Sequence, residues 1–316
     1  IEEHLLEMGK MLSSFASVAA SNPLADRKEG YTPFQIANVT TENPYIGFPY
    51  TKLMNSNAFI DQSAAIILTS VAKAKQLNIP KEKWVYLHGC ADAHDHWFLS
   101  DRINFYSSPA MSTVARETFH MADCTISEID AFDIYSCFPS AIQIACDEMG
   151  LDVDDPRNLT VTGGLPYFGG PGNNYVTHSI AEMMNTVRSR PGIKGLVTAN
   201  GNYITKQSAG IYSTEPIEKP FSPKDPSIYQ AEINSKKGPT VTEFANGKAI
   251  IETYTIMYDR SGPSYGILFG RLDDNSRFIA NTIDDKELML QMTRDDYLGL
   301  SGRVKNIDGV NIFTPD

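Results

Sequence analysis

Cysteine is scarce in this sequence, basic residues are in the minority, and no long apolar run occurs. Four cysteines stand among 316 residues without zinc-type pairing, so we expect reduced thiols rather than a disulfide framework. Lys and Arg number 27 against 38 Asp and Glu, and the resulting net charge of −11 repels a phosphate backbone, which argues against nucleic acid as a partner. No stretch approaches the ~20 apolar residues that span a bilayer, so no membrane partner is expected.

The amino terminus also lacks a targeting pattern. Ile1-Glu2-Glu3-His4 has no basic region followed by an apolar one, as a signal peptide would. We therefore expect a cytoplasmic protein, or a chain from which something upstream has been lost. Apolar content of 42% and charged content of 21% are close to globular averages, and the length suggests two domains with ample core.

Helical and strand patterns alternate in the first two thirds of the chain, which predicts an α/β fold. Residues 20–57 show no clear periodicity, and such a stretch is usually functional or covered by another chain. Ser108-Pro109 and Gly150 have the residue types that begin and end helices. The expected helices are 5–18, 109–120, 139–149 and 180–187, and the expected buried strands are 84–88, 132–135 and 195–198.

The composition changes after Pro216. Residues 217–237 hold three prolines with several lysines and serines, which is typical of a linker. Beyond it, turn residues separate short apolar runs at the spacing of a small barrel or sandwich. We therefore predict an all-β module after the α/β part.

Two polar features have more than one interpretation. His88, Cys90, Asp92, His94, Asp95 and His96 crowd into nine residues, and His94 and His96 could ligate one metal, but a polar loop at a strand end fits the spacing better. Cys137 follows a predicted strand and begins a helix, where a thiol could act as a nucleophile. The alternative is a small, inert filler of the core.

A glycine-rich stretch, TGGLPYFGGPGNNY at 162–175, is more informative. Its glycines permit positive φ and close approach of the backbone, and the next helix offers free N–H groups. It is neither a P-loop nor GxGxxG, and it indicates a loop that lines a pocket. Tyr175, its last residue, and His178 lie on its far side, where an acid or base could reach a carbonyl substrate. The alternative is that both pack against the sheet.

Three runs together resemble thiolase-like proteins related to sterol-carrier-type thiolases, often called acetyl-CoA acetyltransferases. They are DIYSCFPSA at 133–141, the glycine-rich stretch, and GLVTANGNYITKQSAGIYS at 195–213. Residues 248–282 resemble the extra OB-like domain of such proteins, and 47–57 and 61–70 are also similar. The resemblance covers nearly the whole chain. It implies the C-terminal half of a layered α/β thiolase-like fold, followed by a small all-β (OB-like) domain.

The resemblance also implies a chemistry from which this sequence departs. Thiolases use a nucleophilic cysteine in the N-terminal half, together with Gly-His-Pro and Cys-x-Gly loops. Here Gly169-Gly170-Pro171 has glycine where the histidine belongs, and Ala199-Asn200-Gly201 has alanine where the cysteine belongs. Tyr135 stands where a sterol-carrier-type thiolase has histidine. Glycine and alanine can neither take a proton nor attack a thioester.

By the same resemblance the chain divides into three parts. Residues 1–69 would form the loop domain and, near 61–68, the last strand of the N-terminal half; 70–217 would form the C-terminal thiolase-like domain, and 218–316 the OB-like domain. The N-terminal half, in the same or a separate chain, is therefore an expected partner. Family members are usually dimers or larger, so a homo-oligomer is also expected.

Two functions fit these departures. The first is a thiolase-like acyl-CoA-binding protein of lipid metabolism, either an acyltransferase or a carbon–carbon lyase of the retro-aldol type, in which Tyr135, Tyr175 and His178 carry the chemistry. The second is a non-catalytic subunit or scaffold that binds a partner enzyme. The resemblance implies coenzyme A or acyl-CoA as a substrate and no permanently bound cofactor or metal. Its predicted contacts are Asn55, Ser56, Gly169, Gly170, Pro171, Asn173, Ala199, Asn200 and Gly201.

Overall fold

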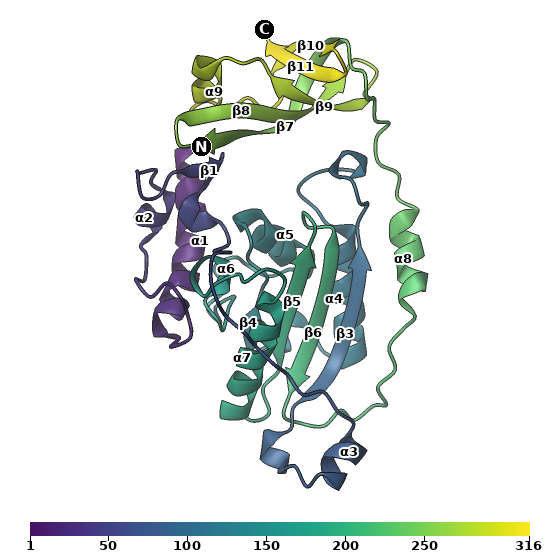
Figure 1. Ribbon diagram of the computed structural model, residues 1–316. Helices are drawn as coiled ribbons and strands as arrows, with labels where there is room; N and C mark the ends of the chain where they lie inside the picture. Colours follow the sequence, from purple (N-terminus) through teal and green to yellow (C-terminus); the bar gives the residue numbers. More distant parts are fainter.

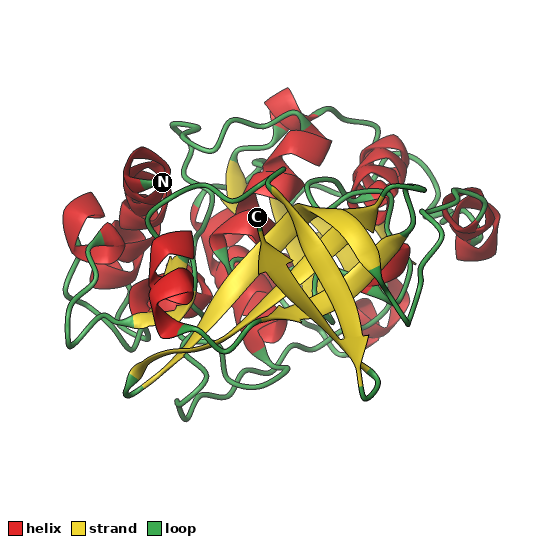
Figure 2. Ribbon diagram, turned by 90° about the horizontal axis from the view of Figure 1, so that it is seen from above, coloured by secondary structure: helices red, strands yellow, loops and turns green.

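An α/β body and a β barrel make up the chain, and the barrel lies beyond one end of the body's sheet (Figure 1). The computed structural model describes all residues, Ile1–Asp316. From above, the barrel overlies the body (Figure 2). None of the helices combines the length and the apolar character needed to cross a membrane.

The body is built on a four-stranded sheet of order β3-β6-β5-β4. Strands β4 and β5 are parallel, whereas β6 runs antiparallel to β3 and β5. The carboxyl ends of β3, β4 and β5 therefore share one edge of the sheet, the edge nearer the barrel (Figure 1). The strands are β3 (Tyr86–His94), β4 (Ala131–Asp133), β5 (Gly195–Gly201) and β6 (Lys206–Ser213).

Of the predicted helices of the body, α5 has the predicted ends and α4 the predicted start, whereas α1 and α7 are longer than predicted. Ser108 caps α4, its Oγ accepting from the N–H of Met111 at 3.0 Å, and Gly150 ends α5 with φ of 68°. Fully buried Phe15 and Phe132 join α1 and the sheet in one core. The helices are α1 (Glu2–Ser21), α2 (Pro33–Ala37), α3 (Val71–Gln76), α4 (Pro109–Ala122), α5 (Pro139–Met149), α6 (Gly164–Tyr167) and α7 (Tyr175–Ser189).

The predicted all-β module is a closed barrel. Its strands follow the order β7-β8-β9-β11-β10, and β10 pairs back onto β7. Helix α9 lies between β9 and β10 in the chain, and this arrangement is OB-like, as the sequence predicts. Leu268, Phe278 and Phe313 fill its core. The elements are β7 (Gly247–Asp259), β8 (Gly262–Leu272), β9 (Arg277–Thr282), α9 (Lys286–Met292), β10 (Ser301–Ile307) and β11 (Val310–Pro315).

A small hairpin from the amino-terminal region extends the barrel's sheet. Strands β1 (Tyr45–Gly47) and β2 (Tyr50–Thr51) pair with each other, and Gly47 lies opposite Met257 of β7. The N–H of Phe48 donates to the carbonyl of Ile256 at 2.8 Å. Part of the predicted loop domain is thus hydrogen-bonded to the OB-like domain, a contact that the sequence did not indicate.

Arg277 of β9 fastens the barrel to the body. Its guanidinium is fully buried, pairs with Glu252 of β7 at 2.6 Å, and donates to the carbonyls of Ser100 and Arg102 in the loop after β3. Burial by itself would raise the pKa of Glu252, but the bonds from Arg277 and Arg271 lower it overall. Barrel and body are therefore joined on two sides, by the bonds from Arg277 to the loop after β3 and by the β1–β2 hairpin.

The predicted linker contains a helix and covers a sheet edge. Helix α8 (Pro226–Asn234) lies beside β3 (Figure 1). The side-chain amide of Gln230 bonds to both the N–H and the carbonyl of His94, at 2.9 and 2.8 Å. Gln230 thus satisfies backbone groups that an edge strand would otherwise expose.

The strand expected near 61–68 is not formed. Residues 60–70 have no helix or strand, and Ile67 and Leu68 are 90% and 89% exposed. A strand requires a neighbour to pair with, and no strand of either sheet bonds to this segment. The strand is therefore absent from this structure, and pairing of 61–68 with the expected N-terminal half stays a prediction.

Candidate functional site

The carboxyl ends of β4 and β5 bring together two of the predicted site positions. Asp133 lies opposite Val197 in the parallel register, so the chain beyond β4 runs beside the end of β5. The N–H of Tyr135 donates to Oγ1 of Thr198 at 2.9 Å, which places Tyr135 next to Ala199. In open α/β sheets, ligands bind at this kind of edge.

The stretch after the β1–β2 hairpin completes the same edge. The N–H of Ser56 donates to the carbonyl of Cys137 at 3.1 Å, and the N–H of Gly170 donates to the carbonyl of Asn57 at 2.8 Å. Residues 55–57, 135–138 and 169–170 are thereby assembled from three distant parts of the sequence. Their contact with coenzyme A stays a prediction.

Four of the five glycines in the 162–175 loop, all except Gly172, lie too close to neighbouring atoms for a side chain to fit without a shift. Gly163, Gly164 and Gly169 have φ of 110°, 76° and 128°, where other residues are strained. A Cβ on Gly170 would overlap Oγ of Ser56. Close contact with Ser56 therefore explains glycine at 170.

A buried carboxylate organises the loop. Asp133 is fully buried, and its two oxygens accept six hydrogen bonds of 2.7–3.1 Å. The donors are the hydroxyls of Thr160, Thr162, Tyr175 and Ser179 and the N–H groups of Val161 and Thr162. Asp133 thus ties β4 to the loop before α6 and to the first turns of α7.

Tyr175 belongs to this network and does not face a ligand. Only 1% of the residue is exposed, and its hydroxyl donates to Asp133 at 2.9 Å and contacts Thr162 at 2.7 Å. Burial, together with the charge of Asp133, raises the pKa of Tyr175 well above its usual value. These contacts give Tyr175 a structural role, and its predicted catalytic role stays a prediction.

Tyr135 is half-buried, and its ring meets that of Tyr175 edge-on at 5.7 Å. Burial raises the pKa of Tyr135 to about 12, so its hydroxyl stays protonated at neutral pH. Tyr135 can therefore donate a hydrogen bond or a proton to an oxygen, but it is a poor base.

His178 is separated from Tyr135 by the rings of Tyr175 and Phe168. Ring contacts run from Tyr135 to Tyr175, then to Phe168 and His178, at 5.7, 6.2 and 5.5 Å. Nε2 of His178 faces the side-chain amide of Asn174 at 3.2 Å, and burial lowers the pKa of the ring, which keeps it neutral at pH 7. His178 and Tyr135 share no hydrogen bond and are separated by the rings of Tyr175 and Phe168.

Cys137 does not have the environment of an activated nucleophile. Burial raises the pKa of its thiol to about 12, despite the neighbouring N–H groups of residues 137 and 138. The reactive form of cysteine is the thiolate. The inert alternative is therefore favoured for Cys137.

The outer positions of the predicted contact set lie around this edge. Nδ2 of Asn55 donates to the carbonyl of Thr51 at 2.7 Å, whereas Asn173 is exposed on the loop. Asn200 and Gly201 are half-buried and pair with β6. Pro171 is also half-buried.

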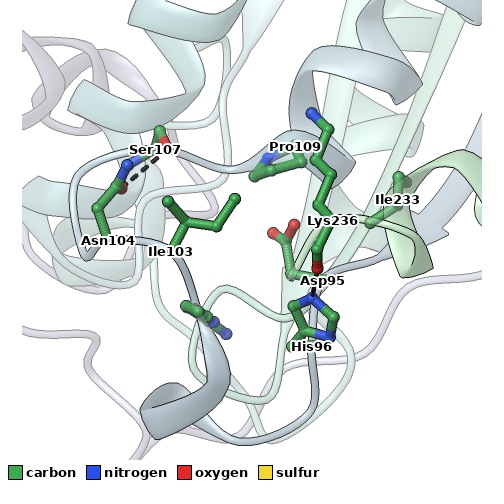
Figure 3. A pocket seen from close by; sticks show the side chains of 9 residues that line it. Asp95, His96, Ile103, Asn104, Ser107, Pro109, Ile233 and Lys236 are labelled. Atoms are coloured by element: carbon green, nitrogen blue, oxygen red, sulfur yellow. Dashed lines mark hydrogen bonds between the residues drawn. The ribbon is translucent and has the colours of Figure 1, made fainter. Parts of the chain in front are cut away.

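The histidine-rich segment 88–96 is part of the attachment between body and linker. Nε2 of His88 bonds to the carbonyl of Glu215 at 2.8 Å, and Nε2 of His96 bonds to that of Lys236 at 2.7 Å. Figure 3 shows His96 and Lys236 beside the Asp95 carboxylate, at a cavity of about 20 Å³. No three His, Cys, Asp or Glu side chains are placed to hold a metal, so the metal interpretation is not supported.

Sequence reasoning missed the two charged residues that matter most for geometry, Asp133 and Arg277. Asp133 lies inside the predicted buried strand 132–135, and a carboxylate there must find several donors. That signal was present in the sequence. No local signal marks Arg277, because its partners lie 25 and about 175 positions away.

Comparison with known proteins supports the thiolase-like fold. Residues 229–309 match the thiolase-like protein type 1 additional C-terminal domain. None of the curated proteins matches the chain. Among solved structures, a monomeric SCP2-thiolase like protein type 1 from Mycobacterium smegmatis is 38% identical, with a TM-score of 0.92 over 100% of this chain and 68% of that chain.

A second solved structure, human mitochondrial 3-ketoacyl-CoA thiolase, is 16% identical over 47% of this chain and 34% of that chain. Its TM-score of 0.37 is too low to support a conclusion. The Mycobacterium smegmatis likeness, in contrast, spans the α/β body and the barrel together, and confirms the predicted fold. The chain therefore belongs to the family of SCP2-thiolase-like proteins of type 1.

Proposed function

We propose that this chain binds acyl-CoA thioesters at the carboxyl edge of β4 and β5 and acts on them without the standard thiolase cysteines and histidine. The observation that carries this proposal is the assembly of residues 55–57, 135–138 and 169–170 at that edge. Coenzyme A or acyl-CoA enters as a substrate, and the same assembly supports backbone contacts to its pantetheine part. A cytoplasmic location and a role in lipid metabolism belong to the same proposal.

Tyr135 is the residue proposed to take part in the chemistry. Gly170 and Ala199 cannot transfer a proton, and the Cys137 thiol stays protonated, so condensation or thiolysis of the standard kind is disfavoured. A protonated phenol beside the sheet edge suits donation to a substrate oxygen, as in acyl transfer or retro-aldol cleavage of a carbon–carbon bond. His178, neutral and 8% exposed, would accept a proton only after a rearrangement of the loop.

The test is calorimetry of the complete protein with coenzyme A and acetyl-CoA, followed by turnover assays of β-hydroxyacyl-CoA and β-ketoacyl-CoA. Saturable binding is expected, and Tyr135→Phe should abolish turnover while leaving affinity within about threefold. His178→Gln serves as the comparison variant, because His178 is separated from Tyr135 by two rings. Absence of any binding would contradict the proposal.

A non-catalytic subunit or scaffold is the second candidate. It is favoured by the same residues that disfavour thiolase chemistry, and by Tyr175 being held within the Asp133 network. If the protein is such a subunit, we expect coenzyme A to bind and the wild-type protein to convert no acyl-CoA at any pH. Equal behaviour of wild type and Tyr135→Phe in all assays would support this candidate.

We also propose that a further thiolase half packs on the exposed segment 61–68. The chain covers 68% of the Mycobacterium smegmatis protein, so about a third of that relative has no counterpart here. Ile67 and Leu68 are almost fully exposed without a strand partner, and an open groove of about 740 Å³ runs between α1 and α7. Pairing of 61–68 in a second sheet would bury both side chains.

The expected homo-oligomer remains a prediction. Because the Mycobacterium smegmatis protein is described as monomeric, a monomer is the competing expectation. Light scattering of the complete protein would distinguish the two.

A further inference from the structure

The outward face of the barrel strands β7 and β8 carries a strip of apolar and hydroxyl side chains. Thr253, Thr255 and Met257 of β7 lie opposite Phe269, Ile267 and Tyr265 of β8, and the alternate residues point into the barrel core. Ile279 of β9 lies opposite Phe269 and continues the same face. We call these seven residues the roof strip; none of them is charged.

One end of the roof strip rests on the loop that follows β3. The rings of Phe269 and Phe105 lie 4.7 Å apart, and Phe105 also stacks under the Arg277 guanidinium at 4.6 Å. That loop leaves the carboxyl end of β3. The contact therefore attaches the roof strip to one flank of the edge at which Tyr135 lies.

The other end rests on the hairpin that leads to Ser56. Met257 pairs with Gly47, and Oγ1 of Thr255 donates to the carbonyl of Phe48 at 2.8 Å. Below the hairpin, the ring of Tyr50 stacks on Phe138 at 6.0 Å, and Ser56 bonds to Cys137. The two supports of the roof strip thus belong to the two flanks of the candidate site, and the strip spans the distance between them.

Large side chains on the roof strip remain uncovered by the rest of the chain. Tyr265 and Ile279 are 48% and 46% exposed, although each is attached to a sheet whose opposite face is a packed core. Figures 1 and 2 agree that the barrel lies over the carboxyl edge of the body's sheet. An uncharged, partly apolar face in this place suits the hydrocarbon part of a ligand whose polar part binds below.

From these contacts we propose that the roof strip binds the apolar part of the acyl group and thereby selects acyl-CoA thioesters with long or bulky acyl chains. This inference rests on the proposed binding of acyl-CoA. It assigns the barrel a role in recognising the substrate, and it predicts that affinity rises with the apolar area of the acyl group. Coenzyme A itself, which has no acyl group, would not use the strip.

The test compares coenzyme A, acetyl-CoA and decanoyl-CoA by calorimetry, using the complete protein. We expect Tyr265→Asp and Ile279→Asp each to weaken decanoyl-CoA binding roughly tenfold, because a buried hydrocarbon contact is replaced by a charge. Affinity for coenzyme A and acetyl-CoA should stay unchanged. Val310→Asp, at a site 48% exposed on the β10–β11 turn away from the body, is the matched control.

Each outcome decides something different. If all variants bind decanoyl-CoA with equal affinity, the proposed acyl-binding role of the roof strip is overturned, and the proposed function is unaffected. Failure of the wild type to bind any of the three ligands overturns the proposed function, and the roof strip with it. If an aspartate variant no longer shows the circular dichroism spectrum of the folded protein, Ile279→Gln is used instead. An unchanged affinity of Ile279→Gln for decanoyl-CoA would also overturn the proposed acyl-binding role of the roof strip.

Discussion

Two charged side chains, Asp133 in the body and Arg277 in the barrel, are both fully buried but are satisfied in opposite ways. Asp133 accepts hydrogen bonds from six neutral donors that lie within 46 positions of it in the body. Arg277 is neutralised by Glu252 of its own domain and reaches across to main-chain carbonyls of the other domain. The first arrangement shapes a loop, and the second holds two domains in one orientation.

This contrast predicts different kinds of damage. Loss of the Asp133 network should disturb the candidate site while the barrel stays in place. Loss of the Arg277 contacts should loosen the barrel while the loop around Tyr175 stays intact. The following variants test that separation.

The largest effect is expected for Arg277→Met. Removal of the guanidinium leaves Glu252 with only Arg271 as a partner and leaves carbonyls in the loop after β3 without a donor, so we expect a loss of about 3–5 kcal/mol in the free energy of unfolding. Urea denaturation measures it, and limited proteolysis between 214 and 246 should become faster. Arg271→Met is the control, since Arg271 shares Glu252 but bonds to no residue of the body. Equal losses in the two variants would contradict the role of Arg277 in domain attachment.

Asp133→Asn should come next. The amide retains the shape of the carboxylate but replaces one acceptor oxygen with a donor, which leaves at least one of the Tyr175 and Ser179 hydroxyls or the 160–162 donors without a partner. We expect a loss of about 2–4 kcal/mol. Asp154→Asn makes the same chemical change at an exposed site and should be neutral. Proteolysis at the linker should not accelerate, and if it does, the proposed separation of the two clusters is wrong.

Tyr175→Phe should cost about 1–2 kcal/mol, because one hydroxyl leaves a network that keeps its other five donors to Asp133. The phenol of Tyr175 should also fail to ionise below the alkaline unfolding transition, since its pKa is strongly raised. Difference absorbance of wild type and variant during alkaline titration checks this. Ionisation of one additional buried tyrosine in the wild type at pH 10 would contradict the assignment.

A smaller effect concerns pH. The pKa of His178 is lower in the folded protein than its ordinary value of 6.5, so the unfolded chain binds more protons as the pH falls through that value. The free energy of unfolding should therefore decrease as the pH falls below about 6.5, and His178→Gln should reduce this dependence. Urea midpoints at pH 7.5, 6.5 and 5.5 measure it. An identical slope in wild type and variant would show that His178 does not contribute.

No measurable effect is expected for Lys219→Ala. The pair of Lys219 with Asp123 is 2.5 Å long, but both side chains are about two-thirds exposed, and water and salt screen such pairs. The thermal midpoint should stay within error at 0.15 M salt. A clear decrease would show that the linker is held mainly by its exposed ion pairs rather than by Gln230 and the histidines.

Much of the fold could be predicted because local signals agree with the tertiary structure. Ser108-Pro109 begins α4 and Gly150 ends α5 for reasons that involve only a few neighbouring residues. Turn residues at short spacing likewise indicated the barrel. Residues 61–68 form no strand in this structure, because a strand needs a neighbouring strand to pair with and a local apolar pattern does not supply one.

The candidate site could be predicted only in part. Its three stretches were identified by resemblance, and the structure places them at one edge. The sequence did not indicate the hydrogen bond of Tyr175 to Asp133, because a tyrosine after a glycine-rich loop has the same local sequence whether its hydroxyl faces a ligand or a buried carboxylate. Asp133, 42 positions away, decides between the two.

By itself, the sequence determined the α/β and all-β parts, the start of α4, the end of α5 and the acidic charge, since these depend on residue identity and near neighbours. The tertiary structure alone decided that Ser56 fills the space at Gly170, that Arg277 joins the barrel to the body, and that the roof strip spans the flanks of the candidate site. The physical reason is that burial and hydrogen-bond partners are properties of residues brought together from distant positions, and an amino acid's identity does not state which partner it will meet.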